Sequence, residues 1–137
     1  MISDYLAEKL VNHSLGLSSF TMPSGVWVAF FTSPIRHFDA LGSLTEVSGG
    51  SYARTSVTMA LWDKGMSINS AKVTMPAPTA DWGRVKSMAL VDNGTSGGNW
   101  LYGANVCPFN INNGDAAYEL DIATITAWLG EGKKGCC

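Results

Sequence analysis

The sequence predicts a mainly β fold: an antiparallel sandwich of the jelly-roll kind, or a related barrel, with one amphipathic helix at its N-terminus. About seven or eight short segments carry strand patterns, and Gly, Pro and Asn turns separate them. Helical periodicity is clear only near the start of the chain. The 137 residues suit a single domain, in which we expect a helix over 4–15, a sandwich over 26–128 and a flexible tail over 130–137.

The helix is the first predicted element. Ser3 is a good N-cap residue, and Asp4 places a negative charge at the positive end of the helix dipole. Gly16 is suited to end the helix, because glycine readily adopts the left-handed conformation that follows a last turn. Apolar side chains recur at helical spacing and form one face, at Ile2, Leu6, Leu10 and Val11.

The first half of the β region predicts three strands. Over 26–31 an uninterrupted run of β-branched, apolar and aromatic residues is typical of a strand covered on both faces. Residues 34–44 are predicted to form a loop. Over 52–62 apolar residues alternate with polar ones, which predicts a half-buried strand. The same alternation returns briefly over 71–75, and a pair of prolines ends it.

The second half predicts a hairpin and one further strand. Strand patterns over 85–91 and 100–106 flank the run DNGTSGG, which is rich in turn-forming residues. Another turn signal at 112–115 precedes the last long strand, which starts at Tyr118. The apolar phase of that strand shifts near Ala123, and a β-bulge would explain the shift.

Composition and charge exclude several kinds of partner. The chain is 46% hydrophobic and only 15% charged, so we expect some apolar surface to face another protein. A formal net charge of -2 without a basic block provides no electrostatic footprint for nucleic acid. The first residues lack the pattern of a secretory signal, and no apolar run approaches the roughly 18 residues of a membrane span. We expect neither nucleic acid nor a membrane as a partner.

Residues suited to catalysis or metal binding are scattered. His13 and His37 have no ligand partner at metal-binding spacing, and phosphate-loop, nucleophile-elbow and zinc-protease motifs do not occur. Acids that strands could pair for sugar hydrolysis all sit at turns or on polar strand faces: Asp63, Asp81, Asp92, Asp115, Glu119 and Asp121. We therefore predict a protein that is not an enzyme and that holds no cofactor and no metal.

Three cysteines form no CxxC pair and leave an odd thiol after any pairing. Cys107 precedes Pro108 and is predicted to be a buried small hydrophobe. Cys136 and Cys137 follow a stretch of glycine and lysine, so they are candidates for intermolecular disulfides. Reduced thiols in a cytoplasmic product are the preferred interpretation, and intermolecular disulfides are the alternative.

Aromatic residues near the hairpin allow two interpretations. Trp82, Trp100 and Tyr102 are candidate members of a sugar-stacking platform, and the last two are candidates for contact with a partner or a glycan. Packing of these rings in a core or an interface is the commoner arrangement and the preferred interpretation, and sugar stacking is the alternative.

The stretch Ser48 to Ser51 contains two adjacent glycines in front of a strand. A phosphate-binding loop would instead lead into a helix and carry a lysine. Gly49 and Gly50 therefore indicate a bend with positive φ or with a close approach of two backbones. We predict that Glu46 and Arg54 form an ion pair across this bend, and that Tyr52 lies on the face toward solvent or a partner.

Three stretches resemble small structural proteins encoded in the virion modules of tailed bacteriophages. They are LTEVSGGSYAR at 44–54, ADWG at 80–83 and GGNWLY at 97–102, and the resemblance spans 41–106. The string E-V-S-G-G-x-Y-A-R is its most specific part. The motif residues are Glu46, Gly49, Gly50, Tyr52, Arg54, Trp82 and Gly83.

The resemblance implies a non-enzymatic structural protein of the virion, made in the cytoplasm of the host bacterium. Such proteins are labelled tail-fibre proteins or serve in capsid decoration. A tail fibre normally needs a long repetitive shaft, and this sequence has no collagen-like segment or heptad run. We therefore expect a cement protein that binds the major capsid protein and stabilises the assembled shell as a homo-oligomer, with the helix and the tail as candidate contacts. The alternatives are a tail-fibre or baseplate module that contacts tail proteins or host glycans, and a freestanding carbohydrate-binding domain.

Overall fold

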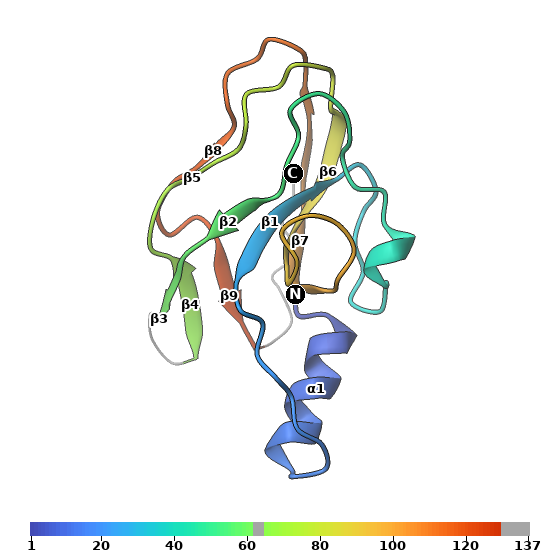
Figure 1. Cartoon of the computed structure of the whole chain (residues 1–137), viewed down its shortest axis with the longest axis vertical. Helices are drawn as coiled ribbons and strands as arrows, with labels where there is room; N and C mark the ends of the chain where they lie inside the picture. The colour runs from blue at the N-terminus through green and yellow to red at the C-terminus, as the bar shows by residue number, and fades with distance from the viewer. Residues whose placement is uncertain (62–64, 130–137) are drawn as a thin grey trace.

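The computed structural model describes residues 1–61 and 65–129, which form one helix followed by nine strands (Figure 1). Their bounds are α1 (Asp4–Ser14), β1 (Val26–Phe31), β2 (Thr55–Val57), β3 (Met59–Leu61), β4 (Met66–Asn69), β5 (Val73–Thr74), β6 (Gly83–Val91), β7 (Trp100–Ile111), β8 (Glu119–Leu120) and β9 (Thr126–Trp128). The predicted tail at 130–137 lies outside the described residues.

All strand pairs are antiparallel, and they form three sheets. The largest sheet has the order β2-β1-β6-β7, the second has β3-β4-β9, and the third joins β5 to β8. None of these sheets closes into a barrel within the described residues. The predicted mainly antiparallel β fold with one N-terminal helix is confirmed.

α1 begins at the predicted cap and leaves the edge of the largest sheet. The Oγ of Ser3 accepts a hydrogen bond from the Leu6 amide at 3.1 Å, and Gly16 follows the last turn with φ of 69°. The Ser3 amide also donates to the Leu101 carbonyl at 2.9 Å, which attaches the start of the chain to β7. From there the helix points away from the strands (Figure 1), and Leu6 is its only buried residue among those described.

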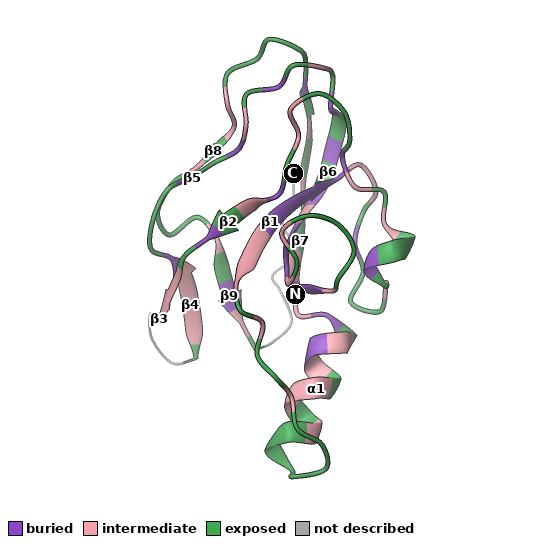
Figure 2. Ribbon diagram, in the orientation of Figure 1, coloured by how far each residue is buried: buried purple, intermediate pink, exposed green. Residues whose placement is uncertain are grey.

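β1 is covered on both faces, as its apolar run predicts. Val28 and Phe30 face a core to which all three sheets contribute, and Ala29 and Phe31 face a second core on the opposite side of the sheet. The loop after β1, which includes a short 3₁₀ helix (Leu41–Ser43), supplies part of that second core. Figure 2 shows β1 buried along most of its length. Successive side chains of β1 thus point in turn into two different apolar cores.

The predicted single strand over 52–62 is wrong. Two short strands lie there, separated at Thr58, because β2 pairs with β1 and β3 pairs with β4 of a different sheet. A strand that changes sheets must bend, and the burial pattern changes with it: Val57 is buried, whereas Leu61 is 83% exposed. The four-residue strand β4, which pairs with β3, was not predicted from the sequence.

The hairpin of β6 and β7 is confirmed and is longer than predicted. The strands pair from Val91 and Trp100 to Gly83 and Ile111, with a register shift between Val85 and Ser87. The following turn is also present, since the Asn112 amide donates to the Asp115 carboxylate at 2.7 Å.

The long last strand that was predicted to start at Tyr118 is not formed. β8 and β9 are two short strands, and the phase shift predicted near Ala123 marks a turn between them in which this residue has φ of 64°. The side chain of Asn69, fully buried at the end of β4, holds that turn. Its amide nitrogen donates to the carbonyls of Ala71 and Asp121 at 2.9 and 2.8 Å, and its oxygen accepts from the Ile125 amide at 2.9 Å. The apolar pattern alone contains no signal for this buried asparagine.

Candidate functional site

The residues of the predicted bend meet in a hydrogen-bonded ion pair. Arg54 Nε donates to Glu46 Oε1 at 2.8 Å, and Arg54 Nη2 donates to Glu46 Oε2 at 2.7 Å. This two-point contact matches the planar guanidinium to the planar carboxylate. The Arg54 side chain is 1% exposed and that of Glu46 is 26% exposed, so the pair lies at the margin of the core. The predicted pairing is present.

Arg54 also ties the bend to the loop between β6 and β7. Its Nη1 donates to the carbonyl oxygens of Asn93 and Gly97 at 2.7 and 2.9 Å. Four N–H groups of the buried guanidinium thereby donate hydrogen bonds, two to the Glu46 carboxylate and two to the loop carbonyls. The hydrogen bond to Glu46 raises the pKa of Arg54, so the group stays charged. Sequence reasoning found the carboxylate partner but missed the two carbonyls, because backbone acceptors have no residue signature.

Tyr52 joins the same network, and the expectation that it faces solvent or a partner is wrong. Its hydroxyl donates to Glu46 Oε1 at 2.9 Å and accepts a hydrogen bond from the Phe30 amide at 3.0 Å. Burial raises the pKa of Tyr52 well above its ordinary range. Its ring meets that of Trp82 edge to face, with centroids 5.2 Å apart. The tyrosine therefore links the ion pair to β1 and to the core.

The two glycines of the bend have the backbone conformation that was predicted. Gly49 has φ of 99° and Gly50 has φ of 52°, and the Tyr52 amide donates to the Gly49 carbonyl at 3.2 Å. A Cβ on Gly50 would come within 2.7 Å of the Ala80 amide nitrogen. The glycines thus allow the bend to pack against residues 79–80.

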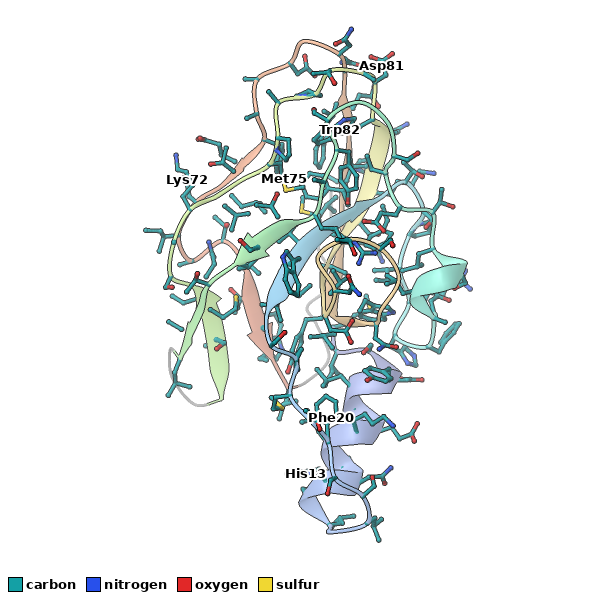
Figure 3. The ribbon with its side chains drawn as sticks, in the orientation of Figure 1. His13, Phe20, Lys72, Met75, Asp81 and Trp82 are labelled. Carbon is teal, nitrogen blue, oxygen red and sulfur yellow. The ribbon has the colours of Figure 1, made fainter. Side chains whose placement is uncertain are left out.

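Trp82 and Gly83 lie where that neighbouring segment enters β6. Trp82 is 3% exposed and lies in the main core with Met75, whereas the adjacent Asp81 lies at the end of the molecule (Figure 3). Gly83, the first residue of β6, has φ of 80°. All seven motif residues therefore lie in one region. There the 46–54 bend packs against the segment that enters β6 and against the loop between β6 and β7. This region, which we call the clasp, consists of Glu46, Gly49, Gly50, Tyr52, Arg54, Trp82 and Gly83.

The platform of aromatic residues proposed for glycans is not formed. Trp100 is 2% exposed, and its Nε1 donates to the Asp39 carbonyl at 2.6 Å, so the ring belongs to the second core. Tyr102 is half-buried and packs against the main core, and burial raises its pKa. Core packing, the preferred interpretation, is confirmed for Trp100, and the alternative that this ring contacts a glycan or partner is wrong, because both faces of the sheet are covered where β7 begins.

The carboxylates considered for catalysis hold turns or strand pairs. Asp92 accepts from the Asn99 amide at 2.7 Å, and Asp81 accepts from the Asn113 amide at 2.8 Å. Lys72 bridges Glu119 and Asp121 at 2.8 and 3.5 Å on the surface of the β5–β8 sheet. Asp63 lies outside the described residues.

Metal-binding clusters and membrane-spanning helices are both absent from residues 1–61 and 65–129. No group of three or more His, Cys, Asp or Glu side chains is placed there to share a metal ion. No helix in this part of the chain is long and apolar enough to cross a membrane. His13 and His37 instead make local contacts. His13 Nδ1 accepts from the Phe20 amide at 3.1 Å, and His37 Nδ1 lies 2.9 Å from the Asp4 carboxylate.

The prediction that Cys107 is buried is wrong. Cys107 is exposed on β7 rather than buried, and it is disulfide-bonded. Residues 107 and 108 lie in the irregular part of the β6–β7 pairing, where β7 holds more residues than β6. Cys136 and Cys137, the candidate intermolecular thiols, lie outside the described residues.

One known protein family matches almost the whole of the described chain. The family model described as podophage GP4 fiber I protein gp80 matches residues 1–127, which include α1, the clasp and the β6–β7 hairpin. No curated protein matches the chain. The match is broader than the sequence resemblance over 41–106, because it begins at the first residue and includes the helix. The chain belongs to the podophage GP4 fiber I protein gp80 family, a family of structural proteins of the bacteriophage particle.

Proposed function

We propose that this protein is a fibre component of a podophage particle, where it serves as a non-catalytic structural part attached to other proteins of the tail. The observation that carries the proposal is the match of residues 1–127 to a fibre protein family. This match favours the tail location, which was the alternative in the sequence-based interpretation, over the capsid location that the compact chain suggested.

The clasp supports a structural role. The charged groups of its ion pair are fully hydrogen-bonded: Arg54 makes four hydrogen bonds, two of them to loop carbonyls, and the Glu46 carboxylate accepts three. Among the clasp side chains, the buried Trp82 Nε1 is the polar atom without a hydrogen-bond partner in the part of the chain that the structure describes. A catalytic or ligand-binding group would instead direct unsatisfied donors or acceptors toward a substrate. The clasp holds a bend, a loop and the main core together, so its function is to give the β body one rigid shape.

Burial of the aromatic residues favours protein partners over host glycans. Trp82 and Trp100 are both almost fully buried, so neither ring offers a face on which a sugar could stack. Large apolar side chains are instead exposed on α1 and the segment after it, which suits contact with protein. The partners proposed are therefore tail proteins and further copies of this chain.

Capsid decoration is the second candidate function. The specific observation in its favour is the compact β body with a projecting helix, which needs no shaft to bind the assembled shell through the major capsid protein (Figure 1). Each of many equivalent copies would then add to the stability of the shell.

Immunogold labelling of native particles distinguishes the two candidates. Antibodies raised against the purified protein are expected to label the tail end of the particle. Label spread over the shell would contradict the fibre proposal and support decoration. Particles without any label, tested beside an antibody against the major capsid protein as a positive control, would contradict both.

A further inference from the structure

The end of α1 and the segment that returns from it form an exposed apolar projection. We call residues 10–25 the foot. Eight large hydrophobic side chains are exposed among the described residues, and four of them lie in the foot. These are Val11, Leu15, Leu17 and Met22, which are 54%, 67%, 71% and 68% exposed. Figure 1 shows the foot projecting from the strands, and Figure 2 shows its end as exposed.

The foot has a defined conformation. The Leu15 and Leu17 amides donate to the carbonyls of Val11 and Asn12 at 3.1 and 2.9 Å, which closes the helix. The Phe20 amide then donates to His13 Nδ1, so the returning segment lies against the last helical turn (Figure 3). Val11 and Leu15 are four residues apart and share one helix face. The apolar side chains are therefore presented from a held surface.

The charge distribution identifies what kind of surface fits the foot. No Asp, Glu, Lys or Arg occurs between Lys9 and Arg36. When a surface meets its own copy across a two-fold axis, a side chain close to the axis meets its own equivalent, so a charged residue there would face a like charge. A surface without formal charge avoids this repulsion. The foot is thus suited to contact a second copy of itself.

The other exposed hydrophobic residues lack this property. Each has a charged residue within two positions in the sequence: Phe38 beside Arg36 and Asp39, Leu61 beside Asp63, Ile122 beside Asp121, and Leu129 beside Glu131. In the foot, Val11 lies two positions from Lys9, and Leu15, Leu17 and Met22 have no charged residue within that distance. The neutral apolar surface is therefore concentrated in one place.

We infer that the foot is the surface through which copies of this chain associate. In this contact Val11, Leu15, Leu17 and Met22 of one copy pack against the same surface of the next, around a rotation axis. The inference goes beyond the proposed place in the particle and does not depend on it. The projection of the foot leaves the β body free to contact other virion proteins while the copies are joined.

The test is the oligomeric state of the purified full chain. Light scattering after size exclusion, over a range of protein concentrations, is expected to show a wild-type oligomer. In the double variant Leu15→Lys and Leu17→Lys, the dissociation constant is expected to rise by about tenfold or more, because cations would be desolvated and would face each other. Lysine near the end of a helix does not oppose its dipole, and both positions are exposed, so the fold is retained.

The matched control is the double variant Phe38→Lys and Ile122→Lys, at exposed apolar positions outside the foot. It is expected to associate as the wild type does. Far-ultraviolet circular dichroism checks each variant, and Leu17→Gln with Met22→Gln provides a milder foot variant if the first one unfolds. A monomeric wild type, a foot variant that associates normally, or a control variant that dissociates would overturn the inference. Since these results are obtained without phage particles, they are distinct from the outcome of immunogold labelling.

Discussion

Removing the Arg54 side chain tests whether the clasp stabilises the fold. Arg54→Ala deprives the Glu46 carboxylate of two donors and the Asn93 and Gly97 carbonyls of one each. Loss of one partner of a buried ion pair destabilises a protein by about 3–5 kcal/mol. The Glu46 side chain keeps 26% exposure and its Tyr52 hydrogen bond, so we expect a loss near the lower limit, about 3 kcal/mol of unfolding free energy.

The double-mutant cycle isolates the ion pair from the rest of the network. Glu46→Ala is expected to cost about 2–3 kcal/mol, because Arg54 retains its two carbonyl acceptors. The double variant is expected to lose about 2 kcal/mol less than the sum of the single losses, since each single variant already removes the contact. This coupling is the part of the stability that belongs to the pair.

Urea unfolding followed by tryptophan fluorescence measures all four proteins. The protein concentration must be the same throughout, because self-association would change the apparent stability. The matched control is the Lys72 and Glu119 pair, which has a similar distance of 2.8 Å but side chains 47% and 49% exposed. Solvent screens such a pair, so its coupling is expected to be much smaller. Losses at Arg54 and Glu46 that add to within about 0.5 kcal/mol would refute the reasoning.

Three further predictions concern single positions. Because burial raises the pKa of Tyr52 from its ordinary value of 10.0, the stability that its neutral hydroxyl contributes is complete below that pH and falls as the pH rises above it. In Tyr52→Phe, the decrease of unfolding free energy with rising alkaline pH should therefore be smaller by up to about 1.4 kcal/mol per pH unit. A pH profile unchanged from that of the wild type would contradict this contribution of the hydroxyl. Gly50→Ala, with its Cβ 2.7 Å from the Ala80 nitrogen, should cost about 2–4 kcal/mol in urea unfolding, whereas Gly42→Ala, which meets nothing within 4 Å, should be nearly neutral; equal effects would refute the close approach. Asn69→Ala should cost about 3 kcal/mol because three buried hydrogen bonds are lost, and a loss below about 1 kcal/mol would show that the turn at Ala123 does not depend on it.

Elements whose signals are local were predictable from the sequence. β1 follows from an apolar run long enough for a strand covered on both faces, and the β6–β7 hairpin follows from two strand patterns around a turn-forming loop. Ser3 and Gly16 bound α1 for reasons contained within the helix itself. The Glu46 and Arg54 pair was predictable because both residues flank one short bend.

Elements that depend on distant partners were not predictable. The division at Thr58 arises because β2 and β3 pair with strands of different sheets, and nothing within 52–62 specifies those partners. Trp100 begins a strand whose local pattern fits an exposed ring equally well, and its burial depends on the loop that includes Leu41. The role of Asn69 depends on residues more than fifty positions away in the chain. In each case tertiary contacts decide an outcome that local patterns leave open.

Electron cryo-microscopy of the intact particle tests the central claim most directly. The account predicts density at the tail into which the β body and projecting α1 fit, with neighbouring copies in contact through their feet. Density for this fold on the capsid shell, or a tail whose density excludes it, would contradict the assignment of the chain as a fibre component.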